Sequence, residues 1–529
     1  MSDLAKEQSQ WRLLSNPVFR ALWIASIASN IGTWMHDVGA GWMMASISPD
    51  PLMVALVQAA TSLPMFLFVL PSGVLSDIID RRKYLIFAQL WMLVTASILG
   101  ALTILGIVNP WVLLIATFML GMGAAMAAPP FQSLLPELVG KDDLSTAVVL
   151  NALGVNISRA IGPALGGFIL SMSGPAVVFI LNAFSVLGTL AVVWAWKPKA
   201  REQHLPSEHF LPAVRAGIRY VAAAPLLRIV ILRAVSFFLF ASAAWSLLPL
   251  IAKNQLGLSA AGYGALLGCI GIGAISGALL LPNLRKKYSA DALLVIASLL
   301  YSLALVGLAL LGNAYLIGVA LTLAGFGWIS SISILSVSAQ GSSAGWVKSR
   351  ALAVYLVAFF GAMTLGSTIW GQISKSFGIE AALLTAAFGM AVVGAIVSRW
   401  RVSGVQDLDL SPVPMHMQDA SAPALEVHHD RGPVMITVEY LVDPVDTEAF
   451  SAAIREMRHV RKRGGALSWA VYRDTHNERR HLEVFVIESW LDHLRQQDHF
   501  SANDARLHKK ALAYHRGDEL PVVTHLISH

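Results

Sequence analysis

A group of positions recurs after 204 residues, and this repeat limits how the chain can fold more than any other feature. Residues 73–77 precede a basic cluster at 81–83, and residues 277–281 precede a second one at 285–287. The same offset relates Gly162 to Gly366, Gly167 to Gly371 and Gly174 to Gly378. Glycines and positive charges that repeat at one spacing across two apolar halves predict an internally duplicated membrane protein. Duplicated membrane bundles are mostly transporters.

The composition fits a membrane protein. Hydrophobic residues make up 56% of the 529 residues and charged residues only 13%, against about 25% charged in ordinary soluble domains. Because a helix needs about 20 apolar residues to cross the hydrocarbon core, the sequence predicts six spans in each half. The twelve expected spans are 20–46, 51–75, 84–106, 111–130, 145–171, 176–196, 228–252, 261–282, 291–311, 314–337, 348–372 and 379–400.

Lysine and arginine give the orientation in the bilayer. With the N-terminus inside, almost all basic residues between spans fall on the cytoplasmic side, and the outer loops hold only Lys253 and Lys375. This asymmetry predicts that both termini are cytoplasmic. It also accounts for the net charge of +6 by membrane topology, so we expect the lipid bilayer, and no nucleic acid, as the partner of these charges.

The chain divides into five predicted segments. Residues 1–200 and 228–400 form the two six-helix halves, joined by a cytoplasmic connection at 201–227 whose apolar residues have helical spacing and predict an amphipathic helix. Residues 401–432 read as a linker, and 433–529 as a small soluble domain. We therefore expect an all-α membrane bundle followed by an α+β domain.

The loop between the second and third spans carries a motif. Gly73, Asp77, Arg81 and Arg82 resemble the loop motif of the major facilitator superfamily, with Asp80 where the family usually has a second glycine. The resemblance implies that the glycine allows close helix approach. It also implies that Asp77 and the arginines hold the cytoplasmic side shut. The alternative is that the basic residues only set topology.

A second motif lies in the fifth span. Gly162, Pro163, Gly166 and Gly167 are similar to the motif of the drug-antiporter branches of that superfamily. Proline bends a helix and small residues let helices pack closely, which suits a helix that seals the outer side. The alternative is ordinary small-residue packing.

More broadly, the first 400 residues resemble the branch that contains bacterial siderophore exporters and transmembrane secretion effectors. Residues 32–35, 136–139, 156–163 and 262–264 carry this similarity. It implies a multi-pass protein of the bacterial plasma (inner) membrane that exports a small organic compound, such as a siderophore, drug or secondary metabolite, by alternating access and proton antiport. Import of a solute is the alternative.

Two ionisable residues fall near the middle of spans. An isolated charge is costly there and marks a functional site by default. Because the first and fifth spans are neighbours in the superfamily fold, we expect Asp37 and Arg159 to form a pair that opens when Asp37 takes a proton or substrate binds. A permanent structural pair is the alternative. Four further residues are candidates for the lining of a substrate cavity: Asn30, Trp34, Asn151 and Asn156.

The tail alternates strand and helix patterns in the order β-α-β-β-α-β, with the second helix expected over 490–515 and Asp446 as N-cap of the first. This order is ferredoxin-like and resembles the antibiotic-biosynthesis-monooxygenase family, which implies a homodimer formed through the sheets. No metal or flavin motif is present, so we expect no cofactor, no metal and no enzyme. The alternative is an oxygenase-like domain that modifies the exported metabolite, with Trp469, His493 and His499 as the residues to watch.

Overall fold

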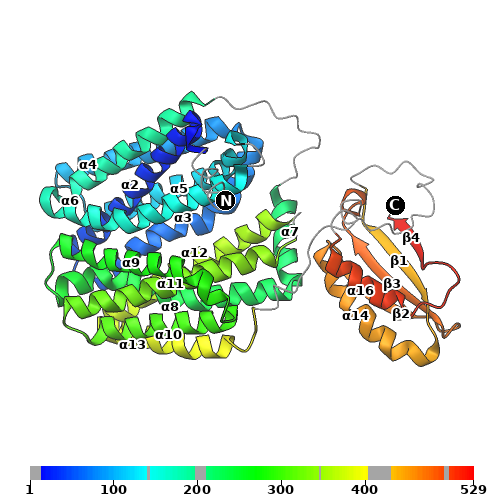
Figure 1. Ribbon diagram of the computed structural model, residues 1–529. Coiled ribbons are helices and arrows are strands. Elements are labelled where there is room, and N and C mark those ends of the chain that lie inside the picture. Colours follow the sequence, from blue (N-terminus) through cyan, green and yellow to red (C-terminus); the bar gives the residue numbers. More distant parts are fainter. Residues whose placement is uncertain are drawn as a thin grey trace, which may run out of the picture. The chain divides into compact units, whose positions relative to one another are not determined.

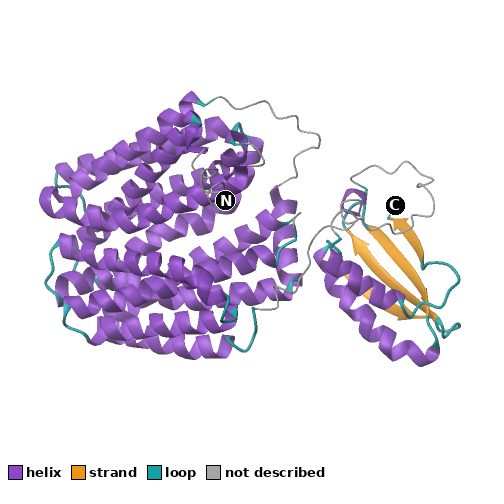
Figure 2. Cartoon of the chain, viewed as in Figure 1, coloured by secondary structure: helices purple, strands orange, loops and turns teal. Residues whose placement is uncertain are grey.

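The computed structural model describes residues 13–139, 143–196, 210–344, 347–402, 431–493 and 500–528. The chain groups into two compact units (Figure 1). The first comprises Met1–Ser207, Leu232–Leu335 and Leu356–Trp400, and the second comprises Glu208–Ile231, Ser336–Tyr355 and Arg401–His529. Figure 2 shows that the first unit is helical and that the strands belong to the second.

Long helices build the first unit, and several begin at a side-chain cap followed by proline. Asn16 caps the first and Asp50 the second, each with proline at the next position, where its missing N–H costs nothing. The helices are α2 (Pro17–Ile47), α3 (Pro51–Ile78), α4 (Arg81–Ile104), α5 (Pro110–Leu138), α6 (Leu144–Ala195), α8 (Pro225–Leu250), α9 (Ala260–Arg285), α10 (Ala290–Leu310), α11 (Ala314–Gly341), α12 (Lys348–Phe377) and α13 (Ile379–Val397).

Ten helices in the described part of the chain are long and apolar enough to cross a membrane. One of them, α6, has 52 residues and breaks at Gly174 into two helical legs. The 31-residue α2 also has the length of a span, although it carries Asn30, His36 and Asp37. A helical leg therefore lies at each of the twelve spans expected from the sequence.

The glycines of the 204-residue repeat occupy equivalent places in the two halves. Gly174 and Gly378 both have positive φ angles, 77° and 91°, a region that favours glycine. Each lies between two helical legs, within α6 and between α12 and α13. Gly162 packs on Trp34 of α2, and Gly366 packs on Leu239 of α8. The internal duplication predicted from spacing is therefore visible in backbone conformation and in packing.

A second pair of repeated glycines joins the halves. A Cβ placed on Gly167 would lie 2.6 Å from the Cα of Gly264 in α9. Its counterpart Gly371 packs on Leu52 and Ala55 of α3. Helices of opposite halves thus approach closely on both sides of the pseudo-twofold relation, and only small residues permit this distance.

The second unit contains α7 (Phe210–Ala223) and a four-stranded sheet with two main helices. The sheet comprises β1 (Val434–Leu441), β2 (Ser468–Arg473), β3 (Arg480–Ile487) and β4 (Val522–Ile527) in the order β2-β3-β1-β4, with all pairs antiparallel. The helices α14 (Thr447–Arg463) and α16 (Ala502–Leu512) contribute to the core beneath one face of the sheet. This is the ferredoxin-like arrangement that the sequence predicts.

Two details of the soluble domain differ from the prediction. The helix expected over 490–515 is interrupted, because Ser501 and Asp504 form a reciprocal capping box that starts α16, and 494–499 lie outside the described residues. Asp446 occupies the N-cap position of α14 without a capping hydrogen bond. Its carboxylate accepts instead from Arg516, at 3.0 Å.

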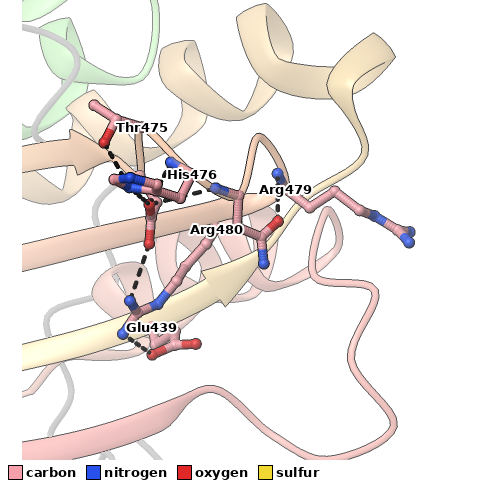
Figure 3. Close-up of polar contacts among 7 residues, drawn as sticks. Glu439, Thr475, His476, Arg479 and Arg480 are labelled. Carbon is pink, nitrogen blue, oxygen red and sulfur yellow. Dashed lines mark hydrogen bonds and ion pairs between the residues drawn. The ribbon is translucent and has the colours of Figure 1, made fainter.

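Charged pairs lie on both faces of the sheet. On the covered face, Glu483 is fully buried and accepts from Arg461 at 3.0 and 3.1 Å and from Trp469 at 2.9 Å. On the open face, Arg480 bridges Glu439 at 2.8 Å and Asp474 at 3.0 Å, beside the β2–β3 turn (Figure 3). The first pair is satisfied within the core, whereas the second remains partly in solvent.

Candidate functional site

A small cavity lies between the two halves of the helical unit. Its volume is about 50 Å³, which gives room for a few water molecules. Residues from α2, α3, α8 and α9 line it, among them Trp34, Asp37, Gln58, Thr61, Trp245, Ser246 and Tyr263. Both halves therefore contribute to one cavity, and among the described residues Asp37 is the one carboxylate that lines it.

The expected pair of Asp37 and Arg159 is not formed in this conformation. The guanidinium of Arg159 lies instead 5.9 Å from the ring centre of Trp34, and within the described ranges no ion pair joins it to Asp37. Trp34 contacts the guanidinium and also lines the cavity that holds the carboxylate. The two charges thus lie near the same indole without direct contact.

Aromatic side chains extend from Trp34 into the second half. The ring centres of Trp34 and Trp245 are 6.1 Å apart, and those of Trp245 and Trp328 are 5.4 Å apart. Phe238 then lies 5.1 Å from Trp328 and 4.3 Å from Phe359. Edge-to-face and tilted contacts at these distances are favourable. A continuous aromatic row therefore begins at the cavity wall, and sequence spacing did not reveal it.

The polar candidates of the first and fifth spans take up local roles. The amide of Asn30 donates to the carbonyl of Ser26 at 2.8 Å, and that of Asn156 donates to Ala152 at 2.9 Å. Both bonds stay within one helix. Of the four predicted lining residues, Trp34 lines the cavity described above, whereas Asn30, Asn151 and Asn156 are not on its wall. Their role in substrate binding stays a prediction.

The two lysines of the predicted outer loops both reach across to the first half. Lys375, near the end of α12, pairs with Asp50 at 2.7 Å, and this hydrogen bond lowers the pKa of the Asp50 carboxyl. Lys253, in a π-helical turn (Ile251–Gln255) that continues α8, donates to the carbonyl of Ala45 at 3.0 Å. We call these contacts the Asp50–Lys375 latch and the Lys253 contact. Lysines are rare in the predicted outer loops, so the sequence already marked Lys253 and Lys375 as unusual.

The loop motif between α3 and α4 is partly described. A Cβ on Gly73 would meet no atom of the described residues within 4 Å, and the close helix approach implied for this glycine stays a prediction. Arg82 donates to the carbonyls of Val193, at 3.3 Å, and Trp194 at the end of α6. Arg81 is the first residue of α4, and Asp80, the departure from the family motif, caps that helix through the amide of Lys83. The side chain of Asp77 lies outside the described residues.

The fifth-span motif forms the contact surface of α6. Gly162 and Gly166 lie against Trp34 and Met35 of α2, and Gly167 lies against α9. Pro163 is inside the helix, and its carbonyl would lie 2.9 Å from a Cβ on Gly264. The motif therefore packs α6 on helices of both halves.

Arg233 of α8 is held by groups at the ends of two other helices of the second half. The residue is 7% exposed and pairs with Asp291 of α10 at 2.8 Å. It also donates to the carbonyls of Ser398 and Trp400 at 3.0 and 2.8 Å. These partners lie far away in sequence, so helical spacing alone did not reveal them.

Residues proposed as markers of catalysis in the soluble domain belong to its packing. Trp469 donates to the buried Glu483. His493 is buried, and its ring lies 5.2 Å from Trp490 and 4.6 Å from His525. His499 lies outside the described residues. In the described part of the chain no group of three or more His, Cys, Asp or Glu side chains is placed to hold a metal.

The duplicated bundle, with a cavity between its halves, defines a multi-pass membrane transporter of the major facilitator type. The chain belongs to the transmembrane secretion effector family, whose model matches residues 8–529. The match includes the soluble domain. Enterobactin exporter EntS of Shigella boydii is 27% identical over 391 residues, covering 73% of this chain and 92% of the relative. EntS of Escherichia coli O81 is similar to the same extent.

Solved transporters share the fold. A bacterial homologue of the human lysosomal transporter Spinster, in an inward-facing and unoccupied conformation, matches with a TM-score of 0.59 at 15% identity. It covers 73% of this chain and 96% of its own. The nucleoside transporter NupG also gives 0.59, at 11% identity, over 72% of this chain and 98% of its own. At these identities the likeness concerns the fold.

Proposed function

We propose that the protein exports a small organic compound, such as a siderophore, drug or secondary metabolite, across the bacterial inner membrane by alternating access coupled to proton influx. The observation that carries this proposal is the Asp37 cavity, which is lined by helices of both halves. A carboxylate at such a place can take up a proton from one side and release it to the other as the halves rock. In the proposed orientation both termini are cytoplasmic.

The contacts between the halves support one state of such a cycle. With the proposed orientation, the Asp50–Lys375 latch and the Lys253 contact lie on the outer side. In the proposed cycle these contacts join the two halves at the outer end of the bundle, and we assign the conformation to a state closed to the outside. Opening requires these contacts and the Gly167–Gly264 approach to separate.

Export, rather than import, is favoured by two resemblances. The fifth-span motif is similar to that of drug antiporters, and the relatives named above are enterobactin exporters. The aromatic row from Trp34 to Phe359 supports an organic substrate with apolar or ring-shaped parts. Protons are the proposed coupling ion.

Transport into inside-out membrane vesicles tests this function. Labelled siderophores and lipophilic drugs are offered with and without an imposed pH gradient, to the native chain and to Asp37→Asn. Accumulation should need the gradient and fall at least tenfold in Asp37→Asn. Glu380→Gln, at an exposed carboxylate at the start of α13, is the matched control and should transport normally. Accumulation that is the same with and without the gradient, and the same in the native chain and in Asp37→Asn, would exclude proton coupling through this carboxylate.

We further propose that the soluble domain is not an enzyme and that it pairs with a second copy through its open sheet face. That face presents exposed apolar side chains from three strands, namely Met435, Tyr472, Val522 and Leu526. The oppositely charged Glu439 and Arg480 lie on the two central strands of this face, beside the β2–β3 turn. A twofold pairing can cover these apolar side chains and exchange the charge pairs between the two copies. Leu526→Asp should convert a dimer to a monomer in light scattering, and an unchanged mass would exclude this face.

A further inference from the structure

Tyr220 joins three parts of the second unit. It lies in the last turn of α7 and is 1% exposed. Its hydroxyl donates to the carbonyl of Ser342 at 3.3 Å and accepts from the amide of Ala344 at 2.9 Å. Both backbone groups belong to the turn between α11 and α12. Since the last carbonyls of a helix lack partners within it, this hydroxyl closes the end of α11.

The ring of Tyr220 also contacts the soluble domain. The guanidinium of Arg463, the last residue of α14, lies 6.0 Å from the ring centre. Arg463 pairs in turn with Asp504, which forms the capping box of α16 with Ser501. One buried tyrosine therefore connects the α11–α12 turn with both main helices of the domain.

Neighbours of Tyr220 on α7 reinforce this connection. Arg219 pairs with Glu488, the residue after β3, at 3.2 Å. On the other side, a Cβ on Gly217 would lie 3.2 Å from the Cβ of Arg350 in the first turn of α12. Helix α7 is thus held between the domain and the ends of two helices that continue into the membrane bundle.

We propose that these contacts form a regulatory joint, made of Tyr220, Ser342, Ala344 and Arg463 together with the Arg219–Glu488 pair. Through this joint the soluble domain holds α7 against the α11–α12 turn. In the proposed transport cycle α11 and α12 move with the second half, so the turn must shift relative to α7 or carry the domain with it. The domain therefore sets the rate of the conformational change while leaving the substrate cavity untouched. This regulatory role rests on the proposed function, but the joint itself does not.

Hydrogen exchange on the full chain in lipid nanodiscs tests the joint without any substrate. Glu488→Lys touches neither α11 nor α12, yet it should speed amide exchange over 336–344 and 217–223 at least threefold. Adding Arg219→Glu to that variant should restore the native rates. Glu478→Lys is the matched control, because Glu478 also pairs with an arginine of the same domain, Arg473, and it should leave both segments unchanged.

Two further readouts separate the possible failures. Unchanged exchange in the β1 and β3 amides shows that the soluble domain of Glu488→Lys remains folded. The second variant, Tyr220→Phe, keeps the ring and loses the hydroxyl, and it should speed exchange over 336–344 by itself. Exchange over 336–344 that stays native in both variants would overturn the joint. In the vesicle assay, Glu488→Lys should change the maximal rate at least twofold with an unchanged KM. If the exchange results support the joint but the chain transports none of the compounds, only the proposed function is refuted. If Glu488→Lys speeds exchange but leaves the transport rate unchanged, only the regulatory role is refuted.

Discussion

The carboxylate of Asp50 and the ammonium of Lys375 lie 2.7 Å apart and connect the two halves of the membrane bundle. Asp50 caps α3, and Lys375 lies in the last turn of α12. Gly371, one turn before Lys375, packs on the first residues of α3. The ion pair thus extends a close helix contact, and in the proposed transport cycle both features separate when this end opens.

Loss of the latch should favour the conformation open at this end. Both side chains are partly exposed, at 48% and 25%, so the pair contributes up to about 1 kcal/mol and its loss shifts the equilibrium up to about fivefold. In a Cys269→Ser background, Lys375→Gln should speed alkylation of Val54→Cys, on the cavity wall, by an impermeant thiol reagent. Lys286→Gln, at an exposed lysine beyond α9, should not. Equal alkylation rates in Lys375→Gln and Lys286→Gln would show that the Asp50–Lys375 pair does not control opening at this end.

Acid should open the Asp50–Lys375 latch only below the ordinary pKa of a carboxyl group. The hydrogen bond from Lys375 lowers the pKa of Asp50, so the charged pair is favoured at and above the ordinary value of about 4. Protonation at lower pH removes the attraction. The alkylation rate of Val54→Cys is divided at each pH by that of a small free thiol, which corrects for the falling thiolate fraction. This ratio should stay constant from neutral pH down to about pH 4 and rise below it, and the rise should be absent in Asp50→Asn. A rise centred near pH 6 would point to a different group.

A side chain at Gly167 should block closure of the halves. The added Cβ would lie 2.6 Å from the Cα of Gly264 and 2.8 Å from the carbonyl of Ala260, and backbone atoms cannot move aside as a flexible side chain can. Gly167→Ala should therefore lower transport at least tenfold at normal expression. Gly268→Ala offers a control on the same helix contact, since its Cβ would lie 3.8 Å from Ala164. If both variants transport alike, this contact is not required.

The sequence revealed the repeat but not its long-range partners. Gly174 and Gly378 were predictable because a fixed offset needs only the sequence, and the ferredoxin-like order followed from strand and helix periodicity. The partners of Arg233 could not be predicted, because Asp291 and Ser398 come near it only in the folded bundle. Likewise, neighbouring spans suggested an Asp37–Arg159 pair, whereas the guanidinium lies over Trp34. Which charges meet depends on side-chain packing that spacing does not encode.

Removing the buried charge of Glu483 should destabilise the soluble domain strongly. Glu483→Gln keeps the shape but leaves the buried Arg461 without its counter-ion. Breaking a buried pair in this way costs about 3–5 kcal/mol. Glu439→Gln removes the exposed partner of Arg480 (Figure 3) and should cost less than about 1 kcal/mol. Hydrogen exchange of the β1 and β3 amides in the full chain measures both, and similar losses would mean that the Arg461 pair is not structurally dominant.

Mild acid should weaken the same domain through His508. Burial, with the nearby positive charge of Arg461, lowers the pKa of His508 to about 4, against an opposing effect of Glu483. The unfolded chain, with an ordinary value of about 6.5, then binds more protons than the folded one between these two values. Stability is therefore complete above about pH 6.5 and declines as the pH falls towards about 4. In His508→Gln this decline, followed by exchange of the β1 and β3 amides, should largely disappear. His476→Gln, at a side chain that is 96% exposed, should keep it, and a native pH profile in His508→Gln would assign the decline to another group.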